Sequence, residues 1–184
     1  MQVARGIENL LGSARIPGCS LAVVGREGVI WSHASGHADV AKRTPAARST
    51  VYHLFSGTKL FTATAVLQLV ERGELDLDAR MTAYLPEFPQ LGEITLRDLL
   101  SHRSGLRETL RGFMAVSFPG EAPPTTAEAL AAYELRASRA PWKKVRYRNV
   151  NYALLGELVS RVSGLEYRDY VRRRILGPLS SDAD

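Results

Sequence analysis

From Phe55 to Val70 the chain reads FSGTKLFTATAVLQLV, a mostly apolar run with Ser56 and Lys59 near its start. Apolar side chains on nearly every face of a helical projection predict a helix that is buried in the core. Arg72 and Gly73 follow the run, and a cation before a glycine is a typical helix end. We therefore expect a buried helix with a serine in its first turn and a lysine one turn later.

The spacing of Ser56 and Lys59 predicts an activated serine. Residues three apart lie on the same face of a helix, so the amine can reach the hydroxyl. Burial disfavours the charged ammonium, and a neutral amine can take the serine proton and make the hydroxyl a nucleophile. The helix N-terminus adds positive potential beside the serine, which favours an oxyanion there.

A structural alternative for Ser56 and Lys59 stays open. The pattern Ser-x-x-Lys fixes only two positions in four, so chance matches are frequent. Ser56 would then be an ordinary N-cap and Lys59 a solvated residue of the first turn. Two observations favour the nucleophile: the chain contains no second Ser-x-x-Lys, and Lys59 opens an apolar helix, not an amphipathic one.

Length and composition indicate one globular domain. The chain has 184 residues, of which 45% are hydrophobic and 23% charged. No apolar run is long enough to span a membrane. The N-terminus lacks a signal-peptide core, which predicts a cytoplasmic protein, or a secreted or periplasmic one whose leader has been removed. Cys19 is the single cysteine, so no internal disulfide is possible.

The basic residues do not predict a nucleic-acid partner. The net charge is +5, and the excess lies late in the chain, at 143–146 and at the triple arginine 172–174. Nucleic-acid binding would suit such a charge. However, the arginines fall on a predicted helix and no aromatic residues interleave with them, so we interpret them as a solvated helix face.

The remaining chain predicts a hairpin followed by helices. Residues 19–24 and 29–34 read as two antiparallel strands around a turn, and residues 36–50 as a polar connection. Residues 106–124 read as an irregular loop suited to covering a site. The expected helices are 2–11, 95–102 with Thr95 as N-cap, an alanine-rich segment from the capping box at 125–128 to 138, 150–163 ended by Gly164, and 166–176 before Gly177-Pro178.

Two further sets of polar residues allow a functional and a structural interpretation. Asp76 and Asp78 are a possible carboxylate pair for a metal or for acid/base chemistry, but aspartates at this spacing more often shape turns. His102 is a candidate general base, but a histidine at a helix end is more often a structural hydrogen-bonding residue. We favour the structural interpretation for both.

Several short motifs together resemble the serine β-lactamase and penicillin-binding-protein-like superfamily, in the branch of class C β-lactamases, D,D-peptidases and β-lactamase-fold carboxylesterases. They occur in the family's order and cover nearly the whole chain. The matching segments are IPG (16–18), FSGTK (55–59), FTA (61–63), GELDLD (73–78), YLP (84–86), ITLRDLLSHRSGL (94–106), YRN (147–149), NYALLG (151–156) and ILGPL (175–179).

The resemblance implies a catalytic set and a reaction. Ser56 would be the acylated nucleophile and Lys59 its proton partner. Tyr147, first in the family's Tyr-x-Asn motif, would act as a second general base that activates water, and Asn149 would hydrogen-bond the substrate. The implied mechanism is acyl transfer through a covalent acyl-enzyme, with no cofactor and no metal. No His/Cys cluster with metal-ligand spacing is present in the sequence.

The chain departs from the family pattern in two places. The third family motif, Lys-Thr-Gly or a His-x-Gly equivalent, is not found after Asn149, and Ala140-Pro141-Trp142 stands where the family often has Pro-Gly. The chain thus resembles the N-terminal part of a longer serine hydrolase. We expect its sheet edge to be covered by a swapped homo-oligomer or by a complementing C-terminal chain.

The sequence as a whole predicts an α/β (α+β), β-lactamase-like fold. We expect one incomplete domain over 1–184, in which a hairpin at 19–34 contributes to an antiparallel sheet and residues 56–176 are mainly helical. The predicted function is serine hydrolysis of a small-molecule ester, β-lactam or D-amino-acid peptide. If the third motif is absent, esters without a carboxylate should be the better substrates. The competing hypothesis is a catalytically incomplete binding module that needs a partner chain.

Overall fold

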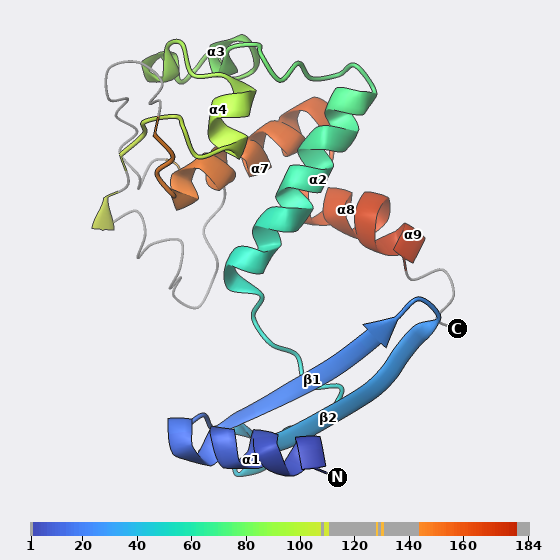
Figure 1. Cartoon of the computed structure of the whole chain (residues 1–184). Helices are drawn as coiled ribbons and strands as arrows, with labels where there is room; N and C mark the ends of the chain where they lie inside the picture. The colour runs from blue at the N-terminus through green and yellow to red at the C-terminus, as the bar shows by residue number, and fades with distance from the viewer. Residues whose placement is uncertain (1, 108, 111–127, 129, 131–143, 180–184) are drawn as a thin grey trace. The chain divides into compact units, whose positions relative to one another are not determined.

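The computed structural model describes residues 2–107, 109–110, 128, 130 and 144–179 (Figure 1). The chain divides into two compact units, Met1–Leu54 and Phe55–Asp184, which are described separately. Most of the alanine-rich helix predicted for 125–138, most of the loop predicted for 106–124 and the segment Ala140-Pro141-Trp142 lie outside the described residues. Within the described ranges, no helix combines the length and the hydrophobicity needed to cross a membrane.

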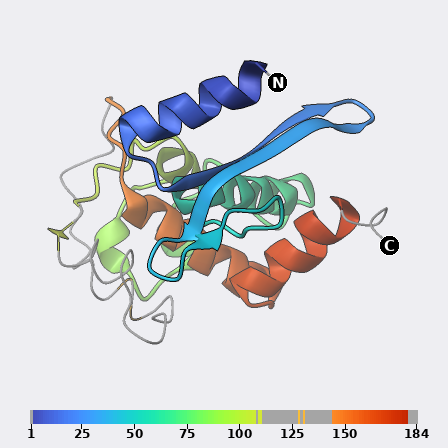
Figure 2. The ribbon, with the colours of Figure 1, turned by 90° about the horizontal axis from the view of Figure 1, so that it is seen from below.

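The first unit is a long hairpin with a helix beside it. Helix α1 covers Gln2–Ala14, and strands β1 (Gly18–Gly25), β2 (Gly28–Asp39) and β3 (Thr44–Pro45) form an antiparallel sheet in the order β1-β2-β3. The β1–β2 register runs from Gly18 opposite Gly36 to Gly25 opposite Gly28. Figure 2 shows α1 running along this hairpin. The predicted hairpin is confirmed.

Strand β2 is longer than the sequence suggests. We expected a connection from residue 36 onward, but β2 continues to Asp39 and then pairs with β3. Gly36 adopts a φ of +78°, where an added Cβ would collide with the Pro17 backbone, and the next amide, of His37, donates to the Pro17 carbonyl at 2.8 Å. The glycine that looked like a strand end therefore lets two backbones approach while pairing continues.

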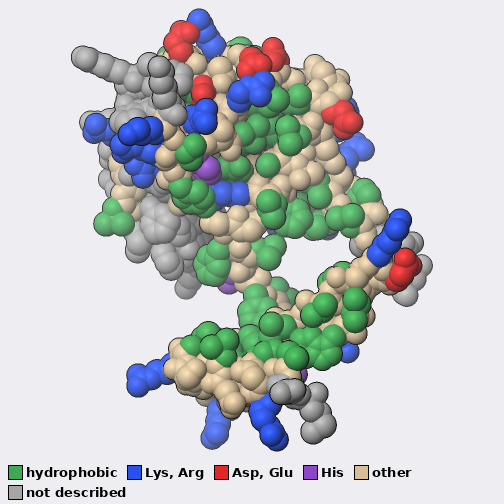
Figure 3. All heavy atoms as spheres, viewed as in Figure 1, with side chains coloured by type: hydrophobic (Ala, Val, Ile, Leu, Met, Phe, Trp, Pro, Cys, Tyr) green, Lys and Arg blue, Asp and Glu red, His purple; other side chains and the backbone are tan. Residues whose placement is uncertain are grey.

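The hairpin carries apolar side chains that remain exposed in the structure. Figure 3 shows them in green along the strands. Val24 and Ile30 are 68% and 73% exposed, which is unusual for β-branched residues in strands. The other exposed apolar side chains of the two long strands are Leu21, Val23 and Val29. Within the first unit, the described residues leave this surface uncovered.

The second unit is helical and holds the hydrophobic core. Helices α2 and α7 pack together, and α8 packs on both of them (Figure 1). Its elements are η1 (Phe55–Gly57), α2 (Thr58–Glu71), α3 (Met81–Tyr84), η2 (Pro89–Leu91), α4 (Leu96–Leu100), α7 (Asn149–Ser163), α8 (Tyr167–Val171), the π-helical turn η3 (Arg172–Leu176) and α9 (Gly177–Leu179). Fully buried side chains include Leu69 of α2, Leu154 and Leu158 of α7 and Tyr170 of α8.

Several predicted helix ends are confirmed. Gly73 and Gly164 follow α2 and α7 with φ of +73° and +69°, a region that favours glycine. Thr95 caps α4 through a capping box with Asp98. The triple arginine 172–174 is exposed, as predicted for a solvated helix face.

Three boundaries differ from the prediction. Ser56 lies in the 3-10 turn η1 and α2 begins at Thr58, because Phe55 takes a φ of +44° that no α-helical residue adopts. Helix α4 ends at Leu100, and His102 follows with a φ of +57°. The last helix continues past Leu176 through Pro178, which is tolerated in the first turn of α9 because it needs no amide donor there.

Helix α2 is buried on one side only. Its buried residues are Thr62, Ala65, Val66 and Leu69. Leu60 and Leu67 are 74% and 49% exposed, and with Thr64 they form one face at helical spacing. The prediction of a helix that is apolar all round is correct, but the described residues cover only part of it.

This asymmetry predicts a large difference between two leucines of α2. Leu69→Ala should lower the free energy of unfolding of the second unit by about 2–5 kcal/mol, because it opens a cavity in the core. Leu67→Ala, two residues away on the same helix, makes the same chemical change at a half-exposed site and should cost less than about 1 kcal/mol. Urea unfolding of both variants measures this. Equal losses would mean that the Leu67 face is also buried.

Candidate active site

Ser56 lies just before the N-terminus of α2, between the amine of Lys59 and the phenol of Tyr147. The Ser56 Oγ lies 2.7 Å from the Tyr147 Oη, and the Lys59 Nζ donates to the same Oγ at 3.4 Å. Ser56 is exposed and Lys59 half-buried, so a substrate in solution can approach the hydroxyl. The structure therefore places the serine within reach of two groups that can exchange protons with it.

Lys59 is held by Asn149 and by two aromatic rings. Its Nζ donates to the Asn149 Oδ1 at 2.8 Å. The same nitrogen lies 4.9 Å from the centre of the Tyr147 ring and 5.6 Å from that of Tyr152, within range of a cation–π attraction. The sequence predicts a buried amine, and among the described residues Lys59 is half-buried. The rings nevertheless fix the amine next to Ser56.

The four predicted site residues form one hydrogen-bonded chain, Asn149–Lys59–Ser56–Tyr147. All four belong to the second unit. Tyr147 lies in the segment before α7, and Asn149 is the first residue of α7, one position before the predicted start at 150. The packing of α7 on α2 brings together residues that are about ninety positions apart in the sequence.

Residues not singled out at first also border the site. Tyr152 packs below Lys59 and donates from its hydroxyl to the Leu100 carbonyl at 3.2 Å. Asn151 is completely buried and hydrogen-bonds Ser104 and His102. The sequence signal that would have identified Asn151 is its position in a mostly apolar helix. A polar side chain that is buried there needs hydrogen-bond partners.

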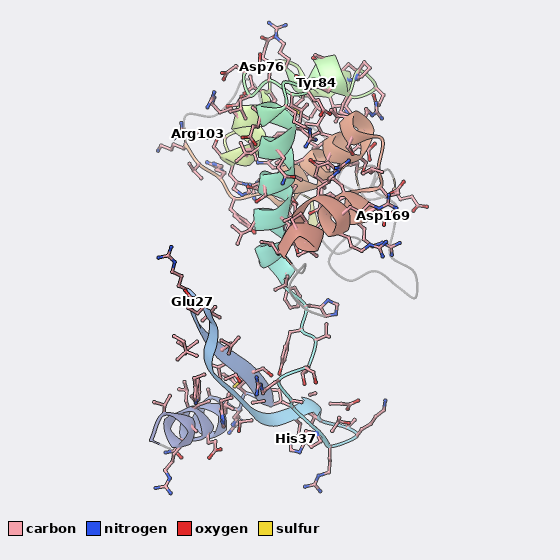
Figure 4. The ribbon with its side chains drawn as sticks, turned by 90° about the vertical axis from the view of Figure 1, so that its right-hand side faces the viewer. Glu27, His37, Asp76, Tyr84, Arg103 and Asp169 are labelled. Carbon is pink, nitrogen blue, oxygen red and sulfur yellow. The ribbon has the colours of Figure 1, made fainter. Side chains whose placement is uncertain are left out.

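Asp76 and Asp78 take structural roles. The Asp78 amide donates to the Asp76 carboxylate at 2.9 Å, and the Tyr84 hydroxyl accepts from the Asp76 amide (Figure 4). Asp78 also forms a bidentate ion pair with Arg97, which holds the pKa of the Asp78 carboxyl below its usual value. Among the described residues, no group of three His, Cys, Asp or Glu side chains could bind a metal ion.

The comparison with known families agrees with this geometry. The family described as Beta-lactamase matches residues 3–182, nearly the whole chain. The chain belongs to the beta-lactamase family. This is a family of serine hydrolases, so the recognition made from the short motifs is confirmed.

Related proteins extend well beyond this chain. The protein flp of Staphylococcus aureus strain N315 is 31% identical over 183 residues, which cover 97% of this chain and 36% of flp. The octameric penicillin-binding protein homologue from Pyrococcus abyssi superposes with a TM-score of 0.84 at 29% identity, over 98% of this chain and 43% of that one. This beta-lactamase-family chain thus spans about half or less of the length of the relatives it matches.

A second similar structure is an amidase. The D-amino acid amidase from Ochrobactrum anthropi SV3, in complex with D-phenylalanine, has a TM-score of 0.84 at 28% identity. The match covers 98% of this chain and 50% of the amidase. These superpositions confirm the predicted fold class, a β-lactamase-like fold fragment with an antiparallel sheet and helices.

The environment of Tyr152 predicts how the stability of this beta-lactamase-family chain depends on pH. Burial, and secondarily the neighbouring Tyr147, raise the pKa of the Tyr152 hydroxyl above its ordinary value of 10.0. The folded state therefore prefers the neutral phenol, and the resulting stability is present below pH 10 and lost as the pH rises through the folded pKa. At pH 8, Tyr152→Phe should cost about 1 kcal/mol for the lost hydrogen bond to Leu100.

Above pH 10 the difference in the free energy of unfolding between wild type and Tyr152→Phe should shrink. Only the wild type has a phenol at this position, which ionises more readily in the unfolded state than in the folded state. Chemical unfolding at pH 8 and at pH 11 measures this difference. Parallel losses of stability in wild type and Tyr152→Phe would contradict the assignment.

Proposed function

We propose that this chain carries the nucleophilic site of a serine hydrolase that works by acyl transfer. The observation that carries the proposal is the position of the Ser56 Oγ, within 2.7 Å of a phenol oxygen and 3.4 Å of an amine. A structural N-cap serine needs neither neighbour. In addition, Ser56 makes no side-chain cap to α2, which begins with Gly57 at its N-cap position.

The reaction follows from the proposed roles of the four residues. The Ser56 oxygen attacks a carbonyl carbon, and its proton passes to the Lys59 amine or to the Tyr147 phenolate. The tetrahedral intermediate collapses when the leaving alcohol or amine takes up that proton, which leaves an acyl group on Ser56. Tyr147 then accepts a proton from water, and the hydroxide attacks the acyl carbonyl. The second tetrahedral intermediate collapses as Tyr147 returns that proton to the Ser56 oxygen, which releases the acid and regenerates Ser56.

The hydrogen-bonded chain supports this division of roles. A cation beside a phenol favours the phenolate, so the Lys59 Nζ suits Tyr147 to act as a base. Asn149 holds the amine through its carbonyl oxygen, and the family resemblance assigns it the further role of hydrogen-bonding the substrate. The N-terminus of α2 adds positive potential where the oxyanion would form.

The substrate classes proposed are esters, β-lactams and D-amino-acid peptides or amides. The similarity to a D-amino acid amidase and to a penicillin-binding protein homologue supports amide-type acyl donors. A screen with one substrate of each class separates these alternatives.

The proposed nucleophile can be tested by covalent labelling. A fluorophosphonate ester should add once to the wild-type chain and not to Ser56→Ala, measured as intact mass. Tyr147→Phe and Lys59→Met should slow the addition by about 10²- to 10⁴-fold, the usual contribution of a general base. Ser13→Ala, an exposed serine of α1, is the control and should react like wild type.

Two outcomes would contradict the proposal. An adduct that persists in Ser56→Ala would place the reactive residue elsewhere. A folded wild-type sample without any adduct would favour the second candidate function, a binding module that carries the family scaffold.

We further propose that the chain associates with a second copy or with a complementing chain. The exposed apolar hairpin and the octameric state in the name of the Pyrococcus abyssi homologue support this. Sedimentation equilibrium at micromolar concentration should detect an oligomer, and Ile30→Lys on the exposed hairpin should weaken it. Glu27→Lys changes the charge in the adjoining turn and serves as control. A monomeric wild type that unfolds cooperatively would contradict the proposal.

A further inference from the structure

His102 joins the loop after α4 to the segment that carries Tyr147. The His102 carbonyl accepts the Arg146 amide at 2.8 Å, and its ring Nδ1 accepts the Arg148 amide at 3.2 Å. Tyr147 lies between these two donors in the sequence. Both backbone positions that flank the phenol are therefore attached to one residue, by its main chain on one side and by its side chain on the other.

The hydrogen bonds define the protonation state of the His102 ring. The Arg148 amide and the Asn151 Nδ2, which lies 3.3 Å from Nδ1, can only donate. Nδ1 is therefore the unprotonated nitrogen, and the proton of the neutral ring is on Nε2. A nitrogen that already receives two donors is poorly placed to serve as a general base, which argues against the catalytic interpretation of His102.

Buried polar groups hold this ring in place. Asn151 is fully buried, its Oδ1 accepts the Ser104 hydroxyl at 2.7 Å, and its Nδ2 donates weakly to the Leu99 carbonyl at 3.4 Å. Ser104 is itself 1% exposed and also accepts the Leu106 amide. Because every one of these groups is buried and satisfied, the position of the Nδ1 acceptor is fixed by the core of the unit.

The ring also packs between two tyrosines. Its centre lies 4.6 Å from that of Tyr147 and 5.2 Å from that of Tyr152, at tilts of 35° and 36°. Ring contacts of this kind tolerate a range of positions, so they do not by themselves fix the phenol. The hydrogen bond from the Arg148 amide to His102 fixes the backbone between Tyr147 and α7, because Arg148 is the N-cap residue of α7.

We infer that His102 is a positioning residue for Tyr147, and that it acts through the acceptor at Nδ1. The inference rests on the proposed role of Tyr147 as a base for Ser56. The phenol oxygen is 2.7 Å from the Ser56 Oγ, so a small displacement of the segment breaks the contact through which a proton would pass. Loss of the acceptor should reduce the chemical step and leave substrate binding unchanged.

A matched pair of variants isolates the acceptor. His102 has a φ of +57°, which both asparagine and glycine tolerate. His102→Asn removes the ring but offers its Oδ1 close to the position of Nδ1, whereas His102→Gly removes the ring and the acceptor together. The backbone carbonyl that binds the Arg146 amide is retained in both variants, so the exchange of that amide serves as an internal control.

Two readouts are measured on the full chain: the kinetics of fluorophosphonate addition and the NMR-detected hydrogen exchange of the Arg146 and Arg148 amides. In His102→Gly, the maximal rate of addition should fall at least tenfold, the half-saturating probe concentration should change less than twofold, and the Arg148 amide should lose protection while Arg146 keeps it. His102→Asn should retain at least a third of the wild-type rate and protect the Arg148 amide.

Similar behaviour of the two variants would overturn the inference. If His102→Asn is as slow as His102→Gly, the loss of ring packing accounts for the effect. If both variants react like wild type, His102 does not position Tyr147. If the wild type itself forms no adduct, the proposed function fails, and the exchange data decide separately: selective loss of Arg148 protection in His102→Gly supports the anchoring role, and unchanged protection rejects it.

Discussion

The hydrogen bond between the Ser56 Oγ and the Tyr147 Oη is the contact on which the candidate site depends. It is 2.7 Å long and joins residues 91 positions apart. Nothing local holds the two groups together: Ser56 precedes α2, Tyr147 precedes α7, and their distance is set by how these helices pack. The buried leucines of α2 and α7 therefore determine the chemistry of the site as well as the stability of the unit.

Much of the fold could be predicted from local signals. The turn between the strands, the glycines at 73 and 164 and the threonine cap at Thr95 each act over a few residues, and all are found where expected. The errors involve non-local causes. Gly36 resembled a strand end because its close approach to Pro17 depends on pairing across the hairpin, and α2 begins two residues late because Phe55 adopts a positive φ.

The residues of the candidate site differ in the kind of sequence signal that predicted them. The spacing of Ser56 and Lys59 indicates their proximity directly, because one helical turn separates them. Nothing in the spacing of Tyr147 and Asn149 relates them to Ser56, and only the family resemblance connected them. Tyr152 and Asn151 were missed because they occupy a helix whose pattern indicates core, and their roles depend on the loop around His102.

In each unit taken by itself, regular elements carry apolar surface that the described residues of that unit do not cover. In the second unit it is the Leu60–Leu67 face of α2, and in the first unit it is both strands of the hairpin. A helix that is apolar all round is normally enclosed on all sides. In the second unit, hydrogen bonds connect the four candidate site residues in series. These observations together describe a β-lactamase-like scaffold whose four candidate site residues lie within one unit.

If Ser56 forms a covalent acyl-enzyme as proposed, a rapid-quench experiment with p-nitrophenyl acetate should show a burst of nitrophenolate close to one equivalent per chain. After the quench, one acetyl group should be found on the peptide that contains Ser56. Release of nitrophenolate at the same rate in wild type and Ser56→Ala, with no acetyl group on that peptide, would contradict the proposal.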